Sequence, residues 1–267
     1  MGIFKSVRNY LQEPRLKGVD PDSDEMIAVH SRILSEKPQM RKVFSEFYDK
    51  CINYDKKYFG DAGGSRVEIG AGVSFFKKKY PEILSTDIKQ AENLDMVVDA
   101  QEMPFQNGSI RAIYGINCFH HFPDPDKFFR ELIRVLDKDG GCVLIDPYYG
   151  FTARRFYKKI FDSETFDMNQ KEWKNESLGY MNGANQALSY IVFKRDKILF
   201  EKKYPELEIV LQKPLNNYLR YLFSGGLNFR SVLPNFFSPL IILFEGILFP
   251  VNSLFALHQI IVIRKKN

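Results

Sequence analysis

The chain contains 267 residues, of which 45% are hydrophobic and 27% are charged, and its formal net charge is +5. This length fits one large domain, and the hydrophobic content supplies a core and excludes a disordered chain. Lysines and arginines are scattered, so no nucleic-acid groove is indicated, whereas acidic substrates and a membrane surface stay compatible with the charge. The cysteines (Cys51, Cys118 and Cys142) have no metal-binding spacing, which favours reduced thiols and a cytoplasmic protein.

Residues 1–64 are predicted to form a helical cap that precedes the core. Apolar and aromatic side chains recur at helical spacing over residues 40–59. The stretch 60–64, Gly-Asp-Ala-Gly-Gly, then breaks the helix before the first core strand.

Residues 65–150 alternate between strand and helix patterns, which predicts a parallel sheet. The expected strands are 66–69, 83–86, 95–98, 111–116 and 141–145. The clearest helix covers 124–137, where an apolar face is followed by Gly140-Gly141 as a stop signal.

Two features of this region suit a nucleotide-like ligand. The short strand Val67-Glu68-Ile69 runs into Gly70-Ala71-Gly72, and glycines let a ligand approach the backbone closely. Asp87 closes the second strand 19 residues after Glu68, near the spacing expected of an acid that binds a ribose. Its two oxygens can accept both hydroxyls of a ribose diol.

Together with three further motifs, these features resemble the class I S-adenosylmethionine-dependent methyltransferases that act on small molecules. The further motifs are Asp99-Ala100-Gln101-Glu102-Met103-Pro104-Phe105, Ile116-Asn117-Cys118-Phe119-His120-His121-Phe122, and Arg134-Val135-Leu136 with Gly140-Gly141. The resemblance covers about residues 65–150. It implies an α/β, Rossmann-like, seven-stranded sheet with helices on both faces, and S-adenosylmethionine as the cofactor.

The resemblance also implies a set of cofactor-binding residues: Glu68, Gly70, Ala71, Gly72, Asp87, Asp99, Ala100 and Asn117. Asp87 would bind the ribose, Asp99 and the Ala100 backbone the adenine edge, and Glu68 would order the glycine loop and the cofactor's ammonium group. Met103 and Phe105 would sandwich the adenine or simply pack in the core. One departure is Ser74, which stands where the family has a third glycine.

Two pairs of residues are candidates for the acceptor side of the site. His120 and His121 follow the fourth strand, at the sheet edge where ligands bind. Either one can be the general base that a hydroxyl acceptor needs, with His121 favoured, or can fix the loop by hydrogen bonds. Tyr148 and Tyr149 follow the fifth strand as substrate-facing or packing aromatics. We expect no metal.

Residues 151–267 are predicted to complete the same fold and to bind the substrate. A helix is expected over 182–193, and the last two strands over 207–211 and 258–263. Within the apolar insertion 231–257 the only formally charged residue is Glu245. Pro239 and Pro250 limit its helix to about ten residues, short of the roughly 20 that span a bilayer. Three roles for this insertion remain possible: a lid over the site, a dimer interface, or a hairpin that rests in the membrane surface.

The stretch Phe223-Ser224-Gly225-Gly226-Leu227-Asn228-Phe229 resembles methyltransferases associated with bacterial cell-envelope glycan synthesis. That likeness implies a sugar or lipid-linked saccharide as acceptor. Oxygen is favoured over nitrogen because no Asn/Asp-Pro-Pro-Tyr-type motif follows the fourth strand.

The sequence thus predicts a cytoplasmic methyltransferase, with the inner face of the membrane as a site of peripheral contact. Two alternatives stay open. A nicotinamide-dependent oxidoreductase would need a third glycine, which is absent between Gly72 and Lys77. A non-catalytic module that binds a membrane or a partner would have a blocked cofactor pocket.

Overall fold

The computed structural model describes residues 8–161, 164–175, 183–216 and 218–266. Seven strands form one sheet in the spatial order β3-β2-β1-β4-β5-β7-β6. The five strands β1 to β5 pair in parallel, whereas β7 runs antiparallel to both β5 and β6. The strands are β1 (Ser65–Ile69), β2 (Ile83–Asp87), β3 (Met96–Val97), β4 (Ile110–Ile116), β5 (Leu136–Pro147), β6 (Leu207–Pro214) and β7 (His258–Lys265). The predicted seven-stranded α/β sheet is confirmed.

The central strands carry near-continuous apolar runs, the pattern of strands that are covered on both faces. In β5, Val143 and Leu144 are both fully buried, and they point to opposite faces because side chains alternate along a strand. Leu144 lies opposite Ile261 of β7, which is also fully buried.

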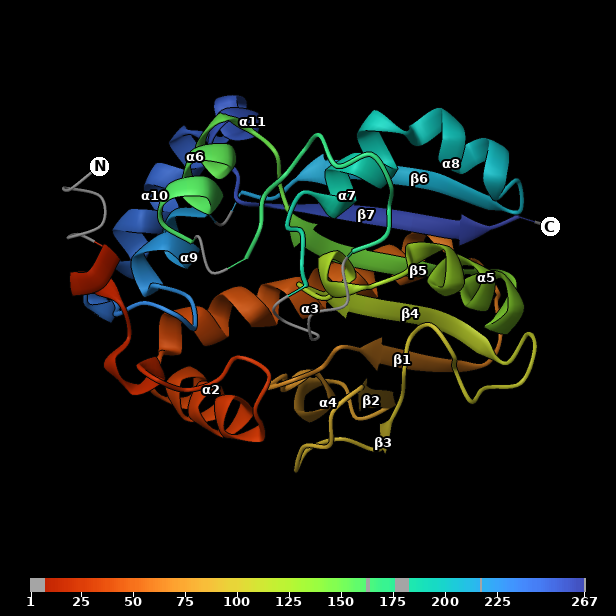
Figure 1. Cartoon of the computed structure of the whole chain (residues 1–267), viewed down its shortest axis with the longest axis horizontal. Helices are drawn as coiled ribbons and strands as arrows, with labels where there is room; N and C mark the ends of the chain where they lie inside the picture. The colour runs from red at the N-terminus through yellow and green to blue at the C-terminus, as the bar shows by residue number, and fades with distance from the viewer. Residues whose placement is uncertain (1–7, 162–163, 176–182, 217, 267) are drawn as a thin grey trace.

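Helices cover both faces of the sheet, as predicted (Figure 1). Phe128, Phe193 and Phe200 fill the core on one face, and Phe47 and Phe76 fill the core on the other. The helices that carry or adjoin these residues are α3 (Pro38–Tyr58), α4 (Phe76–Lys79), α5 (Pro125–Val135), α7 (Leu188–Tyr190) and α8 (Lys197–Lys203).

A second group of helices lies at the end of the sheet toward which β1, β4 and β5 point (Figure 1). They are α2 (Asp24–Glu36), α6 (Phe151–Lys159), α9 (Tyr218–Ser224), α10 (Ser238–Ile247) and α11 (Asn252–Phe255). Helix α2 comes from the predicted cap 1–64, whereas α3 of the same segment packs on the sheet. The carboxyl ends of parallel strands are where open α/β sheets bind ligands, so these helices border the expected site.

The helix predicted over 182–193 needs correction. Within the described residues the helix begins at Leu188 and passes at once into a π-helix, Ile191–Arg195. Its predicted start, Asn182, lies outside the described residues. The strand predicted over 95–98 shortens to two residues.

The helix predicted over 124–137 ends at Val135, because Leu136 already pairs with Ile110 in the sheet. Gly140 does not stop this helix. A Cβ added at Gly140 would lie 2.7 Å from the carbonyl oxygen of Arg111, so this glycine allows two backbone segments to approach closely.

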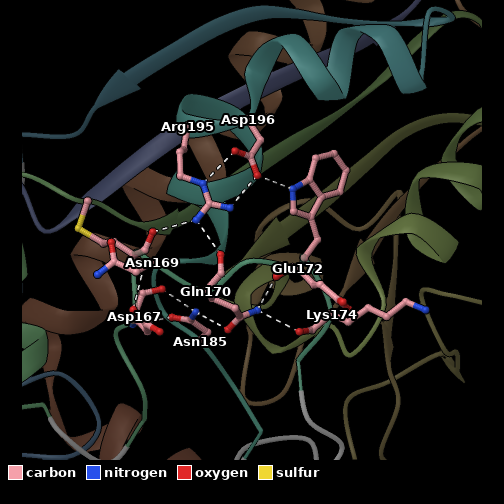
Figure 2. Close-up of polar contacts among 10 residues, drawn as sticks. Asp167, Asn169, Gln170, Glu172, Lys174, Asn185, Arg195 and Asp196 are labelled. Carbon is pink, nitrogen blue, oxygen red and sulfur yellow. Dashed lines mark hydrogen bonds and ion pairs between the residues drawn. The ribbon is translucent and has the colours of Figure 1, made fainter.

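A polar network holds the segment 164–175 against the start of α8 (Figure 2). The Arg195 guanidinium donates to the carbonyl oxygen of Gln170 at 2.7 Å and pairs with the carboxylate of Asp196, also at 2.7 Å. The indole nitrogen of Trp173 donates to the same carboxylate at 3.0 Å.

The same segment fixes the backbone after β4. The side-chain amide of Asn175 donates to the carbonyl oxygens of His120 and Phe122, both at 3.1 Å. The backbone N–H of Asn185, a member of the network in Figure 2, also donates to the His120 carbonyl oxygen, at 3.2 Å. Residues far apart in the sequence therefore position one of the predicted site histidines.

Candidate active site

The turn after β1 brings the backbone against the segment after β4. Gly70 and Gly72 have φ angles of +61° and +52°, in the left-handed region that favours glycine. A Cβ at Gly70 would lie 2.5 Å from the Cβ of Cys118, so a larger residue would clash there. The N–H of Gly72 donates to Oδ2 of Asp87 at 2.8 Å. The predicted glycine turn and ribose-binding acid are thus in direct contact.

A cavity of about 270 Å³ runs along this turn. Its lining includes seven of the eight predicted cofactor residues: Gly70, Ala71, Gly72, Asp87, Asp99, Ala100 and Asn117. The Asp87 carboxylate accepts the N–H groups of Gly72 and Lys89, and each oxygen keeps a further lone pair for a ligand. Oδ1 of Asn117 is buried and accepts no hydrogen bond within the described residues, so a ligand donor would satisfy it.

Glu68, the eighth residue, lies behind the turn and does not line the cavity. Its carboxylate accepts the Ser85 hydroxyl at 2.6 Å, and burial raises the pKa of Glu68 to about 7. Ser74, which replaces the family's third glycine, hydrogen-bonds the Tyr48 hydroxyl and the Phe76 N–H, both at 3.0 Å. Ser74 therefore ties the turn to α3 and α4.

Met103 and Phe105 pack in the core, which is one of the two places that the sequence left open for them. Met103 is buried in the main core, Phe105 packs against that core, and neither lines the cavity. Arg134 of the Arg134-Val135-Leu136 motif donates to the carbonyl oxygens of Met103 and Phe105, at 2.7 and 2.6 Å. This clamp on the loop after β3 is a role that the sequence did not predict.

A second cavity of about 390 Å³ adjoins the first. The two cavities share five lining residues: His30, Phe44, Asn117, His121 and Leu227. The remaining lining of the second cavity is mainly apolar and aromatic, and includes Phe156, Ile160, Leu222, Phe223 and Phe229. Ligands in the two cavities would meet at the shared wall, which is the arrangement that a group-transfer reaction needs.

His120 is the centre of a buried charge network beside this wall. Its Nδ1 lies 2.7 Å from Oδ1 of Asp146, and its Nε2 lies 3.2 Å from Oε2 of Glu164. Burial disfavours the charged ring, but the negative charges of Asp146 and Glu164 outweigh it and raise the pKa of His120 to about 10. At neutral pH His120 is therefore an imidazolium held between two carboxylates and cannot act as a base.

His121 lies on the wall that both cavities share. Its ring centroid is 4.2 Å from that of His120. The ligand atoms of His120, His121 and Glu164 lie within 4.8 Å of one another, a spacing that also suits a metal ion. A metal ion bound there would have to displace the proton of the His120 ring, because only a deprotonated imidazole nitrogen is a ligand. That no metal is used stays a prediction.

The charge of His120 makes folding stability depend on pH. The pKa of His120 rises from 6.5 to about 10 on folding, so its stabilisation is complete below pH 6.5 and is lost as the pH rises toward 10. Between about pH 7 and about pH 9 we expect the free energy of unfolding of the wild-type protein to fall with pH more steeply than that of His120→Asn. The expected difference between the two slopes is about 1.4 kcal/mol per pH unit. Urea denaturation of both proteins measures this difference, and equal slopes would contradict the assignment.

Tyr148 and Tyr149, the predicted substrate-facing aromatics, line neither cavity. The ring centroid of Tyr149 lies 4.4 Å from that of Tyr148 and 4.7 Å from that of Tyr190. The N–H of Tyr148 donates to the carbonyl oxygen of Leu257 at 2.7 Å. The structure places both tyrosines in packing and does not bring them to the site.

Several residues at the site were missed by the sequence analysis. His30 of α2 lines both cavities, and its Nε2 lies 3.2 Å from Oδ1 of Asn228. Asp146 and Glu164 surround His120. None of these residues has a local sequence signal, because their roles come from contacts between distant segments.

The loop 225–229 forms one wall of the second cavity. Gly225 has a φ of +74°, and a Cβ there would lie 2.3 Å from the carbonyl oxygen of Arg230. Lys37, which is buried, donates its ammonium to the carbonyl oxygens of Gly226, at 2.8 Å, and Phe229. The glycines of this motif therefore serve a tight loop that a buried lysine anchors.

Comparison with known proteins agrees with this geometry. Residues 70–144 match the family described as a methyltransferase domain. The uncharacterized methyltransferase YcgJ of Bacillus subtilis is 32% identical over 105 residues, which cover 39% of this chain and 35% of that protein. Phosphoethanolamine N-methyltransferase 2 of Caenorhabditis elegans is 24% identical over 150 residues, which cover 47% of this chain and 34% of that protein. The chain thus spans about a third of the length of the curated relatives it matches.

The likeness of the fold extends over nearly the whole chain. Geranyl diphosphate C-methyltransferase from Streptomyces coelicolor, solved with Mg²⁺, geranyl diphosphate and S-adenosyl-L-homocysteine, superposes with a TM-score of 0.50 at 12% identity. That match covers 96% of this chain and 89% of the other. The chain therefore has the methyltransferase fold, and residues 70–144 match a methyltransferase domain.

Proposed function

We propose that the protein transfers a methyl group from S-adenosylmethionine to a hydroxyl oxygen of a small or lipid-linked acceptor, with a lipid-linked saccharide as the preferred class. The observation that carries this proposal is the pair of adjoining cavities. One is lined by the glycine turn and Asp87, the other is mainly apolar, and His121 lies on their common wall.

The first cavity suits the cofactor in its donors, its acceptors and its shape. Asp87 would accept the ribose hydroxyls, Asp99 and the Ala100 backbone would meet the adenine, and Asn117 would accept a donor with its unpaired Oδ1. The left-handed turn at Gly70 and Gly72 lets the backbone pass close to the methionine part. When bound, S-adenosylmethionine supplies an electrophilic methyl group.

On the acceptor side, His121 would take the proton of the reacting hydroxyl as its oxygen attacks. A general base assists such a step because an alcohol is a poor nucleophile at neutral pH. His120, charged and held by Asp146 and Glu164, would keep the adjacent backbone in place. The aromatic lining of the second cavity would exclude water from the reacting groups.

The choice of acceptor rests on this chain and not on its relatives, which are named for N- and C-methylation. An apolar cavity of about 390 Å³ would hold a hydrocarbon chain better than a free sugar. The saccharide part of the proposal rests on the resemblance carried by the loop that forms the cavity wall.

Transfer from methyl-labelled S-adenosylmethionine to a matched set of acceptors tests this proposal. Free glucose, a short-chain alkyl glucoside and a long-chain alkyl glucoside share one hydroxyl pattern and differ only in apolar length. We expect labelled ether product to increase with chain length, because each buried methylene contributes about 0.8 kcal/mol. Transfer to amines alone, or equal transfer to glucose and the long-chain glucoside, would overturn it.

A further inference from the structure

The helices α10 and α11, with the turn between them and the 3-10 turn Asn235–Phe237 before α10, expose an unusual number of large apolar side chains. Six of these side chains are between 49% and 74% exposed: Phe236, Leu243, Phe244, Ile247, Phe249 and Leu254. We call them the apolar cap surface. Contiguous apolar patches of this kind are rare on monomeric soluble proteins and mark contact with a partner or a membrane.

The orientation of α10 is the reverse of that of a water-facing helix. Its one charged side chain, Glu245, is only 2% exposed, whereas all its large apolar side chains except Ile241 are exposed. The Glu245 carboxylate accepts the backbone N–H of Arg220 at 2.9 Å and the Arg220 Nε at 2.7 Å. Arg220 also pairs with Glu46 of α3.

This buried ion pair holds the helix in place. Rolling α10 to hide its apolar side chains would expose Glu245 and leave Arg220 without a buried partner, which costs several kcal/mol. No described residue from 233 to 257 lines either cavity, so the apolar cap surface is not a lid over the site.

Basic side chains lie beside the apolar cap surface. Helix α6 packs against α11 in one apolar cluster. It exposes Arg154, Arg155, Lys158 and Lys159 and contains no acidic residue. Cations held near an anionic membrane surface are attracted to it. A two-fold dimer on the apolar cap surface would instead bring the basic helices of both copies into one interface.

The dimensions suit the surface of a bilayer. At ten residues, α10 is about 15 Å long, half of the roughly 30 Å hydrocarbon core. Among the described residues no single helix is long and apolar enough to cross a membrane, and residues 235–247 and 249–255 reach that length only as a pair bent by 61°. A helix too short to cross the bilayer can instead rest in its surface, with its exposed apolar side chains at the boundary between headgroups and acyl chains.

We propose that the apolar cap surface and the basic face of α6 dock the protein on an anionic phospholipid bilayer. The docked face adjoins the acceptor cavity, because Phe156 and Tyr157 of α6 line that cavity. An acceptor with a lipid chain would then enter from the membrane side, a consequence that rests on the proposed function. The docking itself does not depend on the identity of the acceptor.

Vesicle flotation tests the docking. We expect the full chain to float with vesicles of phosphatidylcholine and phosphatidylglycerol and to float poorly with phosphatidylcholine alone. The double variant Leu243→Ser/Phe244→Ser should reduce binding about tenfold or more, because two large apolar side chains would no longer enter the bilayer. The matched control is Ile198→Ser/Leu199→Ser, which removes two exposed apolar side chains of α8 outside this surface.

Binding of S-adenosylhomocysteine by each variant reports on folding separately from docking. Failure of the wild-type chain to float, or equal losses in the two double variants, would overturn the proposal. The proposal would also be overturned if the wild-type chain sedimented as a dimer and bound no vesicles, and if Leu243→Ser/Phe244→Ser abolished that dimer. Flotation without methyl transfer would leave the docking intact and count against the proposed function alone.

Discussion

Replacing Asp87 by alanine is expected to weaken binding of S-adenosylhomocysteine about 100-fold or more. The Asp87 carboxylate lines the first cavity, and in the proposed site it would accept both ribose hydroxyls, with each hydrogen bond to a charged group contributing about 1.5–3 kcal/mol. The substitution also removes the acceptor for the N–H of Gly72, which loosens the glycine turn. Isothermal titration calorimetry measures the dissociation constant directly.

Two further variants sharpen this test. Asp87→Asn keeps one carbonyl oxygen and the side-chain shape, so an intermediate loss of about tenfold is expected. Asp61→Ala changes an exposed acid that lines neither cavity and should leave the dissociation constant unchanged. Wild-type affinity in a folded Asp87→Ala protein would contradict the assignment of the ribose site.

Replacing His121 by glutamine is expected to lower kcat for a hydroxyl acceptor by about 10²–10⁴-fold, the usual contribution of a general base. His121 lies where the two cavities meet, whereas both ring nitrogens of His120 face carboxylates. Binding of S-adenosylhomocysteine should change little, because the proposed role concerns the acceptor proton. Initial rates with labelled cofactor measure the effect.

His30→Gln is the comparison variant, because His30 is the other histidine on the shared wall among the described residues. Burial lowers the pKa of His30, and its ring is held by Asn228. We therefore expect His30→Gln to raise the acceptor KM more than it lowers kcat. A large loss of kcat in His30→Gln with little loss in His121→Gln would transfer the role of base to His30.

The sequence predicted the sheet well because its signals are local. Apolar strands, the turn at Gly70 and the acid at the end of β2 follow from residue types within a few positions. The parallel arrangement then brings Gly72 and Asp87 together without further information. The same logic placed His120 and His121 at the carboxyl edge of the sheet.

Long-range contacts set the limits of that prediction. The protonation of His120 depends on Asp146 and Glu164, which lie 26 and 44 positions further along the chain. The sequence left α10 open as lid, interface or membrane contact. Its orientation is decided by the pairing of Glu245 with Arg220, 25 residues away. For Tyr148 and Tyr149 the sequence left substrate contact and packing open, because a position after a strand does not fix the direction of a side chain, and the structure shows that they line neither cavity.

The central claim is that the first cavity binds S-adenosylmethionine. The alternatives are that it binds a dinucleotide or that it binds no ligand. A non-catalytic binding module would have a blocked pocket, whereas an open cavity runs along the glycine turn. A dinucleotide-binding turn would have a third glycine, and none stands between Gly72 and Lys77. The most direct test is calorimetric titration of the wild-type chain with S-adenosylhomocysteine and, separately, with NAD. The account predicts micromolar binding of S-adenosylhomocysteine alone. Binding of NAD, or no binding of S-adenosylhomocysteine by folded protein, would contradict it.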